Sequence, residues 1–408
     1  MLNALEVMGI AIVAGLAAGR LAERISVPSV AGYVVVGVLL GESVFGVFNA
    51  TVLDRMGIVG DLALGIIAFS IGGELEWRVV RRLARSLFPI VLLEAFGAMV
   101  AVTGAVWWLT ADPPLALVLG AISAATAPAA TIMVVRELRA SGVLTRTLMA
   151  VVGIDDAIAL VLYGVGSAMA KAMLTGGAEV SWTAVGAAAG WEIGGALALG
   201  AAAGLAVGPL LSRLDSREHV LSVAVGALVG IAGVAEWLDF SPLLANMTFG
   251  VLLINIAPIS TRALVEDVSL LGAPILIGFF VLAGAHLRVD LLPALGLLGL
   301  VYLLARMAGK VSGAWLGAVL SGADPQVRRN IGLGLLSQVG IAIGLSLVVA
   351  NEFSAYGEAG RRLAVTVINV LLATTVVTEV VGPWLTRQAL IRAGEAGRMD
   401  EEPRRTVP

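Results

Sequence analysis

Apolar stretches long enough to cross a membrane follow one another along the whole 408-residue chain, separated by short polar segments. A helix needs about 20 predominantly apolar residues to span the hydrocarbon core of a bilayer. The pattern predicts an all-α polytopic membrane protein with about thirteen transmembrane helices. The predicted spans are 3–19, 27–45, 56–74, 87–110, 115–136, 147–172, 182–211, 219–236, 243–257, 266–286, 294–320, 328–350 and 361–387.

The composition agrees with a place in the lipid bilayer and excludes several kinds of site. Hydrophobic residues make up 59% of the chain and charged residues 13%, whereas a soluble protein carries about 25% charged residues. The absence of cysteine excludes disulfides and thiolate metal sites, and two histidines leave little for a histidine-rich metal centre. The net charge of −3 gives no indication of a nucleic-acid partner. Because the first 19 residues contain no Lys or Arg, we expect a retained first helix rather than a cleaved signal peptide.

The placement of basic residues predicts how the chain is oriented. If the N-terminus is outside, 19 of the 26 Lys and Arg residues fall in cytoplasmic segments and only five in external ones. Cytoplasmic loops of membrane proteins carry an excess of Lys and Arg. We therefore expect the N-terminus outside and the C-terminus in the cytoplasm.

The chain carries a weak internal repeat. The motif Gly37–Leu40 recurs as Gly250–Leu253 at an offset of 213, and Gly72–Leu75 aligns with Gly284–Leu287 at an offset of 212. The second copy begins with the eighth predicted span, so the two copies enter the membrane from opposite sides. Inverted repeats of this kind are typical of secondary transporters with a binding site near the bilayer midplane.

Two adjacent aspartates, Asp155 and Asp156, interrupt an otherwise apolar segment. Asp155 lies nine residues into the sixth span, about 13 Å deep at 1.5 Å per residue, which is close to the midplane. Ionisable residues at that depth are costly and usually functional. Successive helical positions differ by about 100°, so one carboxylate can pair with a fixed cation while the other faces a water-filled cavity. The alternative is a pair of buried aspartates that only hold helices together.

A second polar motif, Thr126–Thr131, lies at mid-depth in the fifth span. Pro128 removes a helical hydrogen bond, and the freed carbonyls and Thr hydroxyls could bind a small cation. A simple proline kink is the alternative. Adding the repeat offset of 212 to Thr126 and Pro128 gives Gln338 and Gly340 in the twelfth span. The repeat therefore predicts two broken helices that cross within the membrane.

The eleventh span contains Arg306 and Lys310, four residues apart and so on one face of the helix. A buried Lys can exchange its proton when a competing cation takes its carboxylate, whereas Arg stays charged at ordinary pH. We expect Arg306 to be structural and to form an ion pair with its repeat equivalent, Glu94. Three further polar residues within spans are left without a role: Glu192, Asn369 and Glu379.

Segments spread over nearly the whole chain match the motifs of a known family. They are Pro28–Tyr33, Gly37–Gly41, Ile67–Leu75, Thr126–Thr131, Arg136–Gly142, Asp155–Asp156, Phe280–Gly284, Gly309–Lys310 and Gly332–Gly344. In these segments the chain resembles the bacterial monovalent cation:proton antiporters of the second family, most closely the sodium/proton antiporters of the NapA type. The Asp-Asp pair with a downstream Lys is the more specific part of the match, whereas the glycine motifs are generic to the superfamily.

The resemblance implies a thirteen-helix homodimer in the bacterial cytoplasmic membrane. Helices 1–3 and 8–10 would form a dimerisation domain, helices 4–6 and 11–13 a mobile core, and helix 7 a linker. The corresponding ranges are 1–86 and 213–290 for dimerisation, 87–175 and 291–388 for the core, 176–212 for the linker and 389–408 for a disordered cytoplasmic tail.

The resemblance also implies roles for individual residues. In that family the first Asp of the pair forms a salt bridge with the Lys of the core, and the second binds the cation. This implies an Asp155–Lys310 salt bridge, with Na⁺ or Li⁺ at Asp156. Further ligands would come from Thr126 and from the backbone near Ala127 and Ala130.

Two details of the match bear on the exchange that it implies. The Asp-Asp form, in contrast to Asn-Asp in electroneutral relatives, implies electrogenic exchange of more than one proton per sodium ion. Gln338 stands where the family often has an acidic residue, so the match does not extend to a pH-sensing role there.

The function predicted is antiport of Na⁺ or Li⁺ against protons by alternating access, with no resident cofactor and no enzymatic activity. Protons and the cation would compete for the same carboxylates, so the site holds one or the other. A K⁺/H⁺ antiporter of the same family would show a similar pattern. A sodium-coupled organic-anion symporter fits less well, because the carboxylates would repel its substrate. An intramembrane aspartyl protease is a further alternative, but it needs two aspartates that face each other from different helices, and adjacent residues of one helix cannot do so.

Overall fold

A computed structural model describes residues 3–24, 29–48, 53, 56–175, 182–211, 213–214, 216–256 and 258–398 of the chain. The predicted all-α class is confirmed, since every element in these residues is a helix. The helices are α1 (Ala4–Arg24), α2 (Ser29–Leu40), α4 (Gly57–Glu74), α5 (Trp77–Thr110), α6 (Pro113–Ser123), α7 (Pro128–Glu137), α8 (Val143–Thr175), α9 (Trp182–Leu211), α10 (Arg217–Trp237), α11 (Pro242–Ile256), α12 (Pro258–Ala285), η1 (Val289–Leu291), α13 (Leu292–Leu320), α14 (Pro325–Asn330), η2 (Ile331–Leu335), α15 (Gly340–Ser354) and α16 (Gly357–Arg392).

Each of the thirteen predicted spans coincides with one helix or with one interrupted helix pair. In the described part of the chain, eight helices are long and apolar enough to cross a membrane, or up to nine if the bent pair α14–η2 and α15 counts as one span. Four shorter apolar helices, in α2, α4, α6 and α11, accompany them. The total of thirteen stays a prediction.

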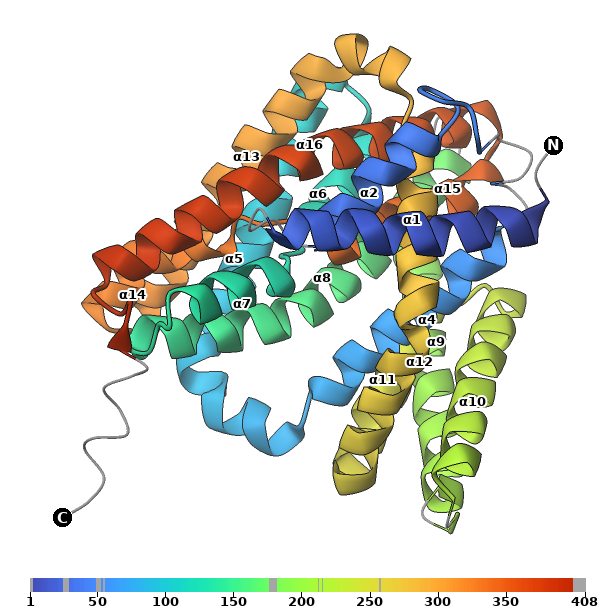
Figure 1. Ribbon diagram of the computed structural model, residues 1–408, viewed down its shortest axis with the longest axis horizontal. Coiled ribbons are helices and arrows are strands. Elements are labelled where there is room, and N and C mark those ends of the chain that lie inside the picture. The colour runs from blue at the N-terminus through green and yellow to red at the C-terminus, as the bar shows by residue number, and fades with distance from the viewer. Residues whose placement is uncertain are drawn as a thin grey trace.

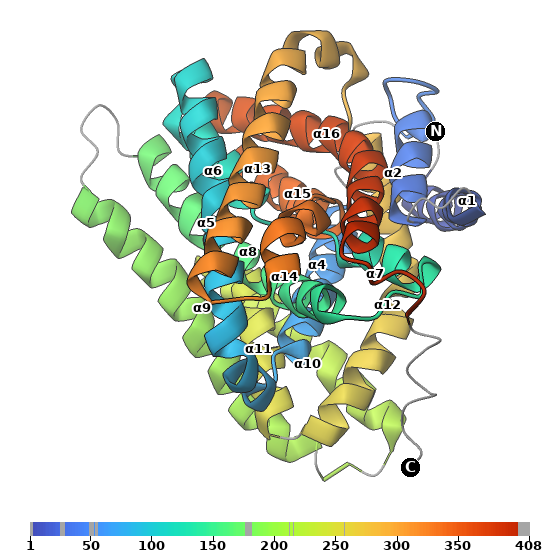
Figure 2. The same cartoon turned by 90° about the vertical axis from the view of Figure 1, so that its left-hand side faces the viewer.

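The helices pack into two groups (Figures 1 and 2). The core bundle contains α5, α6, α7, α8, α13, α14, η2, α15 and α16, and the flanking bundle contains α1, α2, α4, α9, α10, α11 and α12. In Figure 1, α9, α10 and α11 lie at the lower right, whereas α14 lies at the left and α13 and α16 extend across the upper part of the molecule to that side. The helix α9 packs most on α11, next on α8 of the core bundle and then on α10, so it lines the boundary between the bundles.

Glycine contacts between helices follow the internal repeat. A side chain at Gly37 in α2 would overlap the backbone of Val281, close to Gly284 in α12. In the same way, Gly72 in α4 and Gly250 in α11 leave no space for a side chain between their helices. The repeat makes Gly37 equivalent to Gly250 and Gly72 equivalent to Gly284. The α2–α12 and α4–α11 contacts are therefore the same contact made twice, which supports a duplicated architecture.

The longest helix contact in the core bundle is between α5 and α13. Gly97 and Gly309 face one another there, and a side chain on either would overlap the carbonyl group of the other. They are 212 residues apart, which is the repeat offset. Further along, Gly313 lies against the backbone of Leu93 and Glu94. Small residues let membrane helices approach to backbone contact, and here they bring α5 and α13 together along much of their length.

Both predicted broken helices are present. The backbone leaves the helical conformation between α6 and α7 and again between η2 and α15, where the two arms are bent by 44°. The breaks touch each other: the Ala127 amide donates a hydrogen bond to the Ser337 carbonyl oxygen at 2.9 Å. Gln338 Nε2 donates to the Ile122 carbonyl oxygen at 3.0 Å. The two interrupted helices thus cross at their non-helical segments, as predicted.

The prediction of a disordered tail from residue 389 is wrong for the described residues. The last helix continues to Arg392, and the Glu395 side chain is only 4% exposed. Its carboxylate accepts three hydrogen bonds of 2.7 Å, from the amides of Leu144 and Thr145 and from Thr145 Oγ1. A carboxylate that satisfies the free amides at the start of α8 is stabilised by them and by the helix dipole. Residues 399–408 lie outside the description.

Substitution of Gly97 by Val is expected to destabilise the fold, because the new side chain would force α5 away from α13. Overpacking usually costs about 1–3 kcal/mol, and the clash with the Gly309 backbone favours the upper end. Gly104→Val on the same helix is the matched control, since nothing lies within 4 Å of a Cβ placed there. Thermal unfolding in detergent should show a lower midpoint for Gly97→Val alone. Equal midpoints for the two variants would contradict the packing argument.

Candidate ion-binding site

The two adjacent aspartates lie in the middle of α8, which is continuous from Val143 to Thr175. Asp155 is fully buried and Asp156 is 7% exposed. They therefore lie inside the core bundle rather than at a lipid-facing surface, although the helix around them is apolar. Two carboxylates in such surroundings need cationic or hydrogen-bonding partners close by.

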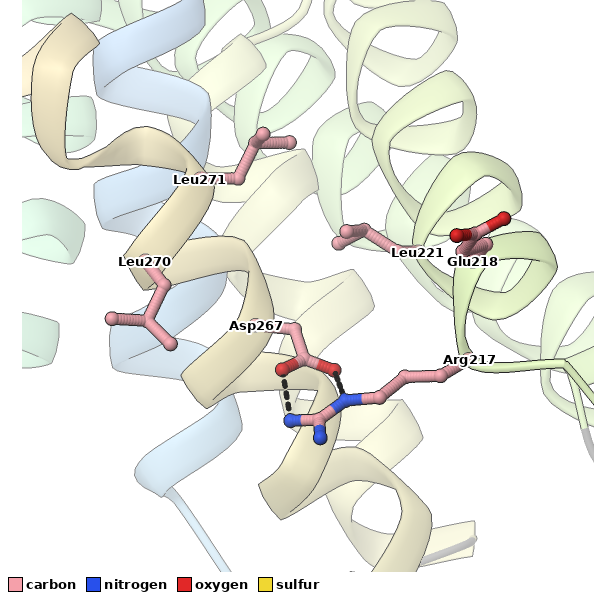
Figure 3. A pocket seen from close by; sticks show the side chains of 6 residues that line it. All are labelled: Arg217, Glu218, Leu221, Asp267, Leu270 and Leu271. Carbon is pink, nitrogen blue, oxygen red and sulfur yellow. Dashed lines mark hydrogen bonds and ion pairs between the residues drawn. The ribbon is translucent and has the colours of Figure 1, made fainter.

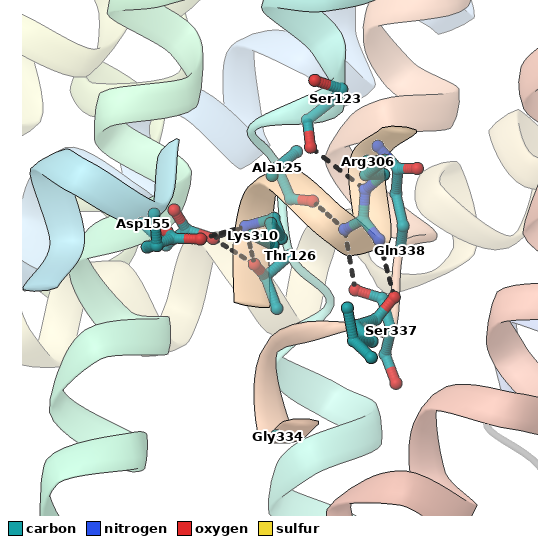
Figure 4. Close-up of polar contacts among 12 residues, drawn as sticks. Ser123, Ala125, Thr126, Asp155, Arg306, Lys310, Gly334, Ser337 and Gln338 are labelled. Carbon is teal, nitrogen blue, oxygen red and sulfur yellow. Dashed lines mark hydrogen bonds and ion pairs between the residues drawn. The ribbon is translucent and has the colours of Figure 1, made fainter. Parts of the chain in front are cut away.

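Lys310 of α13 supplies the cation at the centre of the site (Figure 4). Its ammonium nitrogen lies 3.2 Å from Asp155 Oδ2, 2.6 Å from Glu94 Oε2 and 2.7 Å from Thr126 Oγ1. The Thr126 hydroxyl in turn donates to the same Asp155 oxygen. An ammonium group has three donors, and all three are used. The structure thus contains the expected Asp155–Lys310 pair, with a second carboxylate bound to the same Lys.

Arg306, one turn before Lys310, binds the two breaks instead of a carboxylate. Its guanidinium donates to the carbonyl oxygens of Ser123 at 3.0 Å, Ala125 at 2.7 Å and Leu336 at 2.7 Å, with a longer contact of 3.5 Å to Ser337. These carbonyls come from both interrupted helices, as Figure 4 shows for those it labels. A planar group with five donors can satisfy several freed carbonyls at once.

The predicted Glu94–Arg306 ion pair is wrong, since the Glu94 carboxylate binds Lys310. The error comes from the direction of the helices. The contacts of Gly97 with Gly309 and of Glu94 with Gly313 show that α5 and α13 run antiparallel. A residue that precedes Gly97 therefore lies beside residues that follow Gly309. Equivalent positions meet on the repeat axis at the glycines and separate on either side of it.

Gln338 ties the two breaks together. Besides its bond to Ile122, it accepts a hydrogen bond of 3.1 Å from Tyr302 Oη, and it is 1% exposed. The predicted backbone ligands Ala127 and Ala130 are also buried. The Ala127 amide is already bonded across the break, which leaves carbonyl oxygens as its possible ligands. Pro128 begins α7, and its side chain lies outside the description.

Glu94 Oε1 and Asp155 Oδ1 are buried carboxylate oxygens of the site that accept no hydrogen bond from the described residues. A buried oxygen with no partner is costly, because it has lost its water without compensation. The second oxygen of each carboxylate is held by Lys310. The site thus offers unused oxygen ligands next to Asp156, which suits a small cation or a proton.

The structure shows the contacts of the three intramembrane polar residues to which the sequence assigned no role. Asn369 in α16 accepts a hydrogen bond from the Arg288 amide at 2.8 Å, which ties the start of the η1 segment to the core bundle. Glu192 forms an ion pair of 3.0 Å with Lys171. Glu379 is 1% exposed, and neither of its carboxylate oxygens has a hydrogen-bond partner.

A cleft of about 600 Å³ lies elsewhere, between α10 and α12 of the flanking bundle (Figure 3). It is lined by Arg217, Glu218, Leu221, Asp267, Leu270 and Leu271. Arg217 and Asp267 form a two-bonded ion pair across it. Because its one basic group is paired with the facing carboxylate and the remaining lining is mostly leucine, this cleft does not share the chemistry of the Lys310 site.

Comparison with known proteins agrees with this architecture. The family model described as "Sodium/hydrogen exchanger, transmembrane" matches residues 8–388. The sodium proton antiporter MjNhaP1 from Methanocaldococcus jannaschii, solved at pH 8, is similar in structure with a TM-score of 0.80 and 18% identity, over 96% of this chain and 98% of that one. A second structure of MjNhaP1, from an electron-microscopy map, gives a TM-score of 0.69 and 18% identity over 98% of both chains. No curated protein sequence matches the chain. With nearly its whole length matched, the chain belongs to the transmembrane sodium/hydrogen exchanger family, whose members are multi-pass cation/proton antiporters and not enzymes.

Proposed function

We propose that this protein exchanges Na⁺ or Li⁺ for protons across a bacterial cytoplasmic membrane and is an antiporter of the NapA type. The observation that carries the proposal is the Lys310 ammonium, held by Asp155 and Glu94 one residue from Asp156 and beside two broken helices. Asp156 is the cation ligand in this scheme. Thr126 and the carbonyls near Ala127 and Ala130 complete the coordination.

The arrangement supports competition between protons and the cation. In the state described, the Asp155 carboxylate is bound to Lys310 and Thr126. A cation that takes oxygens from Asp155 and Asp156 must weaken the hold of Asp155 on Lys310. The ammonium then loses part of its stabilisation and can release its proton, and a protonated Asp156 must release one as well. One Na⁺ thus displaces two protons, and net charge moves across the membrane.

Alternating access follows from the two bundles. We propose that the core bundle is the mobile domain, that the flanking bundle apart from α9 is the dimerisation domain of a homodimer, and that α9 is the linker. Several contacts between the bundles are apolar and involve glycine: Gly164 packs against Leu244, and Gly344 packs against Leu64. Such contacts can slide without breaking polar bonds. The arginine distribution supports an external N-terminus and a cytoplasmic C-terminus.

Substitution of Asp156 by Asn should abolish exchange while leaving the fold intact, because it removes the charged ligand without changing the side-chain size. We expect a loss of at least 100-fold in Na⁺-driven proton movement, measured with a pH-sensitive dye in proteoliposomes. Asp290→Asn is the matched control, since that carboxylate is 56% exposed and pairs with Arg288 outside the site. Robust exchange by Asp156→Asn would refute the proposed cation site.

Electrogenic exchange makes a second prediction. If two protons move against one Na⁺, a membrane potential imposed with K⁺ and valinomycin should accelerate or reverse Na⁺-driven proton movement according to its sign. Collapse of that potential should remove the effect, and the assay should be repeated with Li⁺ in place of Na⁺. A rate indifferent to voltage would contradict the two-proton scheme. Exchange driven by K⁺ in preference to Na⁺, measured with the potential set by another ion, would identify a potassium antiporter of the same family.

A further inference from the structure

A second cluster of charged side chains lies at the far end of α8. Lys171 Nζ is 3.0 Å from Glu192 Oε1 of α9 and 3.0 Å from Glu352 Oε2 of α15. The three side chains are only 12–21% exposed. A Lys bound by two carboxylates in such surroundings is a defined structure rather than a loose surface pair, which would contribute little.

The cluster continues along the helix that carries the aspartates. Tyr163 and Ser167, both on α8 and both buried, donate hydrogen bonds of 3.2 and 3.1 Å to the Glu352 oxygen that also binds Lys171. Asp156, Tyr163, Ser167 and Lys171 follow one another along α8 at spacings of seven, four and four residues. Their side chains therefore lie on one side of the helix. At 1.5 Å per residue, Lys171 is about 22 Å from Asp156 along the axis.

The Lys171–Glu192 ion pair connects the core bundle to the flanking bundle. Lys171 and Glu352 belong to the core bundle, whereas Glu192 is on α9, which packs mainly within the flanking bundle. The ion pairs Arg217–Asp267, Lys310–Glu94, Lys310–Asp155, Arg362–Glu358 and Arg387–Glu137 each lie within one bundle, whereas Lys171–Glu192 joins the two bundles.

We propose that Lys171 is an interdomain latch that releases Glu192 and keeps Glu352 each time the core bundle moves during exchange. This inference rests on the proposed antiport and adds residues that position the two bundles. Removing the partner of a buried charge is normally costly. Here the cost is limited, because Glu352 travels with Lys171 and keeps the ammonium paired. Glu192, already partly exposed, turns to water. The latch therefore stabilises the conformation described here and can still open.

The competing interpretation is a permanent tie. The helices α8 and α9 follow one another in the chain, and Lys171–Glu192 could simply hold this helix pair together in every state. The two interpretations differ in one measurable way. A covalent link between the two positions is harmless if the tie is permanent and stops transport if the contact must open.

The chain has no cysteine, so paired cysteines can be introduced without further changes. Lys171→Cys with Glu192→Cys should be linked in proteoliposomes by a bis-methanethiosulfonate reagent whose spacer replaces the two lost side chains. Lys171→Cys with Glu352→Cys is the matched control, because it loses Lys171 as well but joins two helices of the core bundle. Na⁺-driven proton movement is measured before linking, after linking and after reduction with dithiothreitol.

The latch predicts that linking positions 171 and 192 slows exchange at least tenfold, that reduction restores it, and that linking 171 and 352 changes it less than twofold. Unchanged exchange after complete 171–192 linking, or equal loss in both variants, would overturn the latch. If a double variant is inactive before linking, the single variant Glu192→Cys replaces it. Its cysteine should be alkylated by a water-soluble maleimide faster during exchange than at rest. Equal rates of alkylation would overturn the latch. Wild-type protein that moves no protons with any cation would instead refute the proposed function.

Discussion

The structure depends on one buried positive charge, the ammonium of Lys310. Moving a charged group out of water costs several kcal/mol unless partners replace its hydration. The partners come from three different elements: Glu94 from α5, Thr126 from the first break and Asp155 from α8. The buried ammonium therefore needs oxygen atoms from the protein. They are brought to it by the glycine contacts between α5 and α13, the break in the fifth span and the aspartates in the apolar helix α8.

Two cations one helical turn apart on α13 divide the work at this centre. Arg306 binds backbone carbonyls of both interrupted helices, and it stays charged at any ordinary pH. It is suited to hold the crossover in one geometry throughout a cycle. Lys310 instead binds the side-chain carboxylates of Glu94 and Asp155. In the proposed mechanism the permanent charge of Arg306 therefore fixes the crossover of the interrupted helices, and Lys310 takes part in the exchange.

The sequence predicted those features that depend on local chemistry or on the repeat. Pro128 and the repeat offset placed both breaks, and the Asp155–Lys310 pair followed from the family motif. The Glu94–Arg306 pair failed because the offset identifies equivalent positions, whereas contact depends on the antiparallel course of α5 and α13. The positions of Glu395 and Lys171 could not be predicted either. Each is held by partners more than 20 residues away, and hydropathy alone does not indicate which distant residues a charged side chain contacts.

The helix α8 is fastened differently at its two ends, and this bears on how a movement could reach the aspartates. Its first turn is capped by Glu395, which follows α16, so that attachment lies within the core bundle. Its last turns are attached through Lys171 to both bundles. In the proposed movement of the core bundle, the first attachment would stay unchanged and only the second would be strained. Because α8 is an unbroken helix between them, the proposed movement of the core bundle would carry Asp156 with the capped end, and the contact with Glu192 is the one that our proposal requires to open.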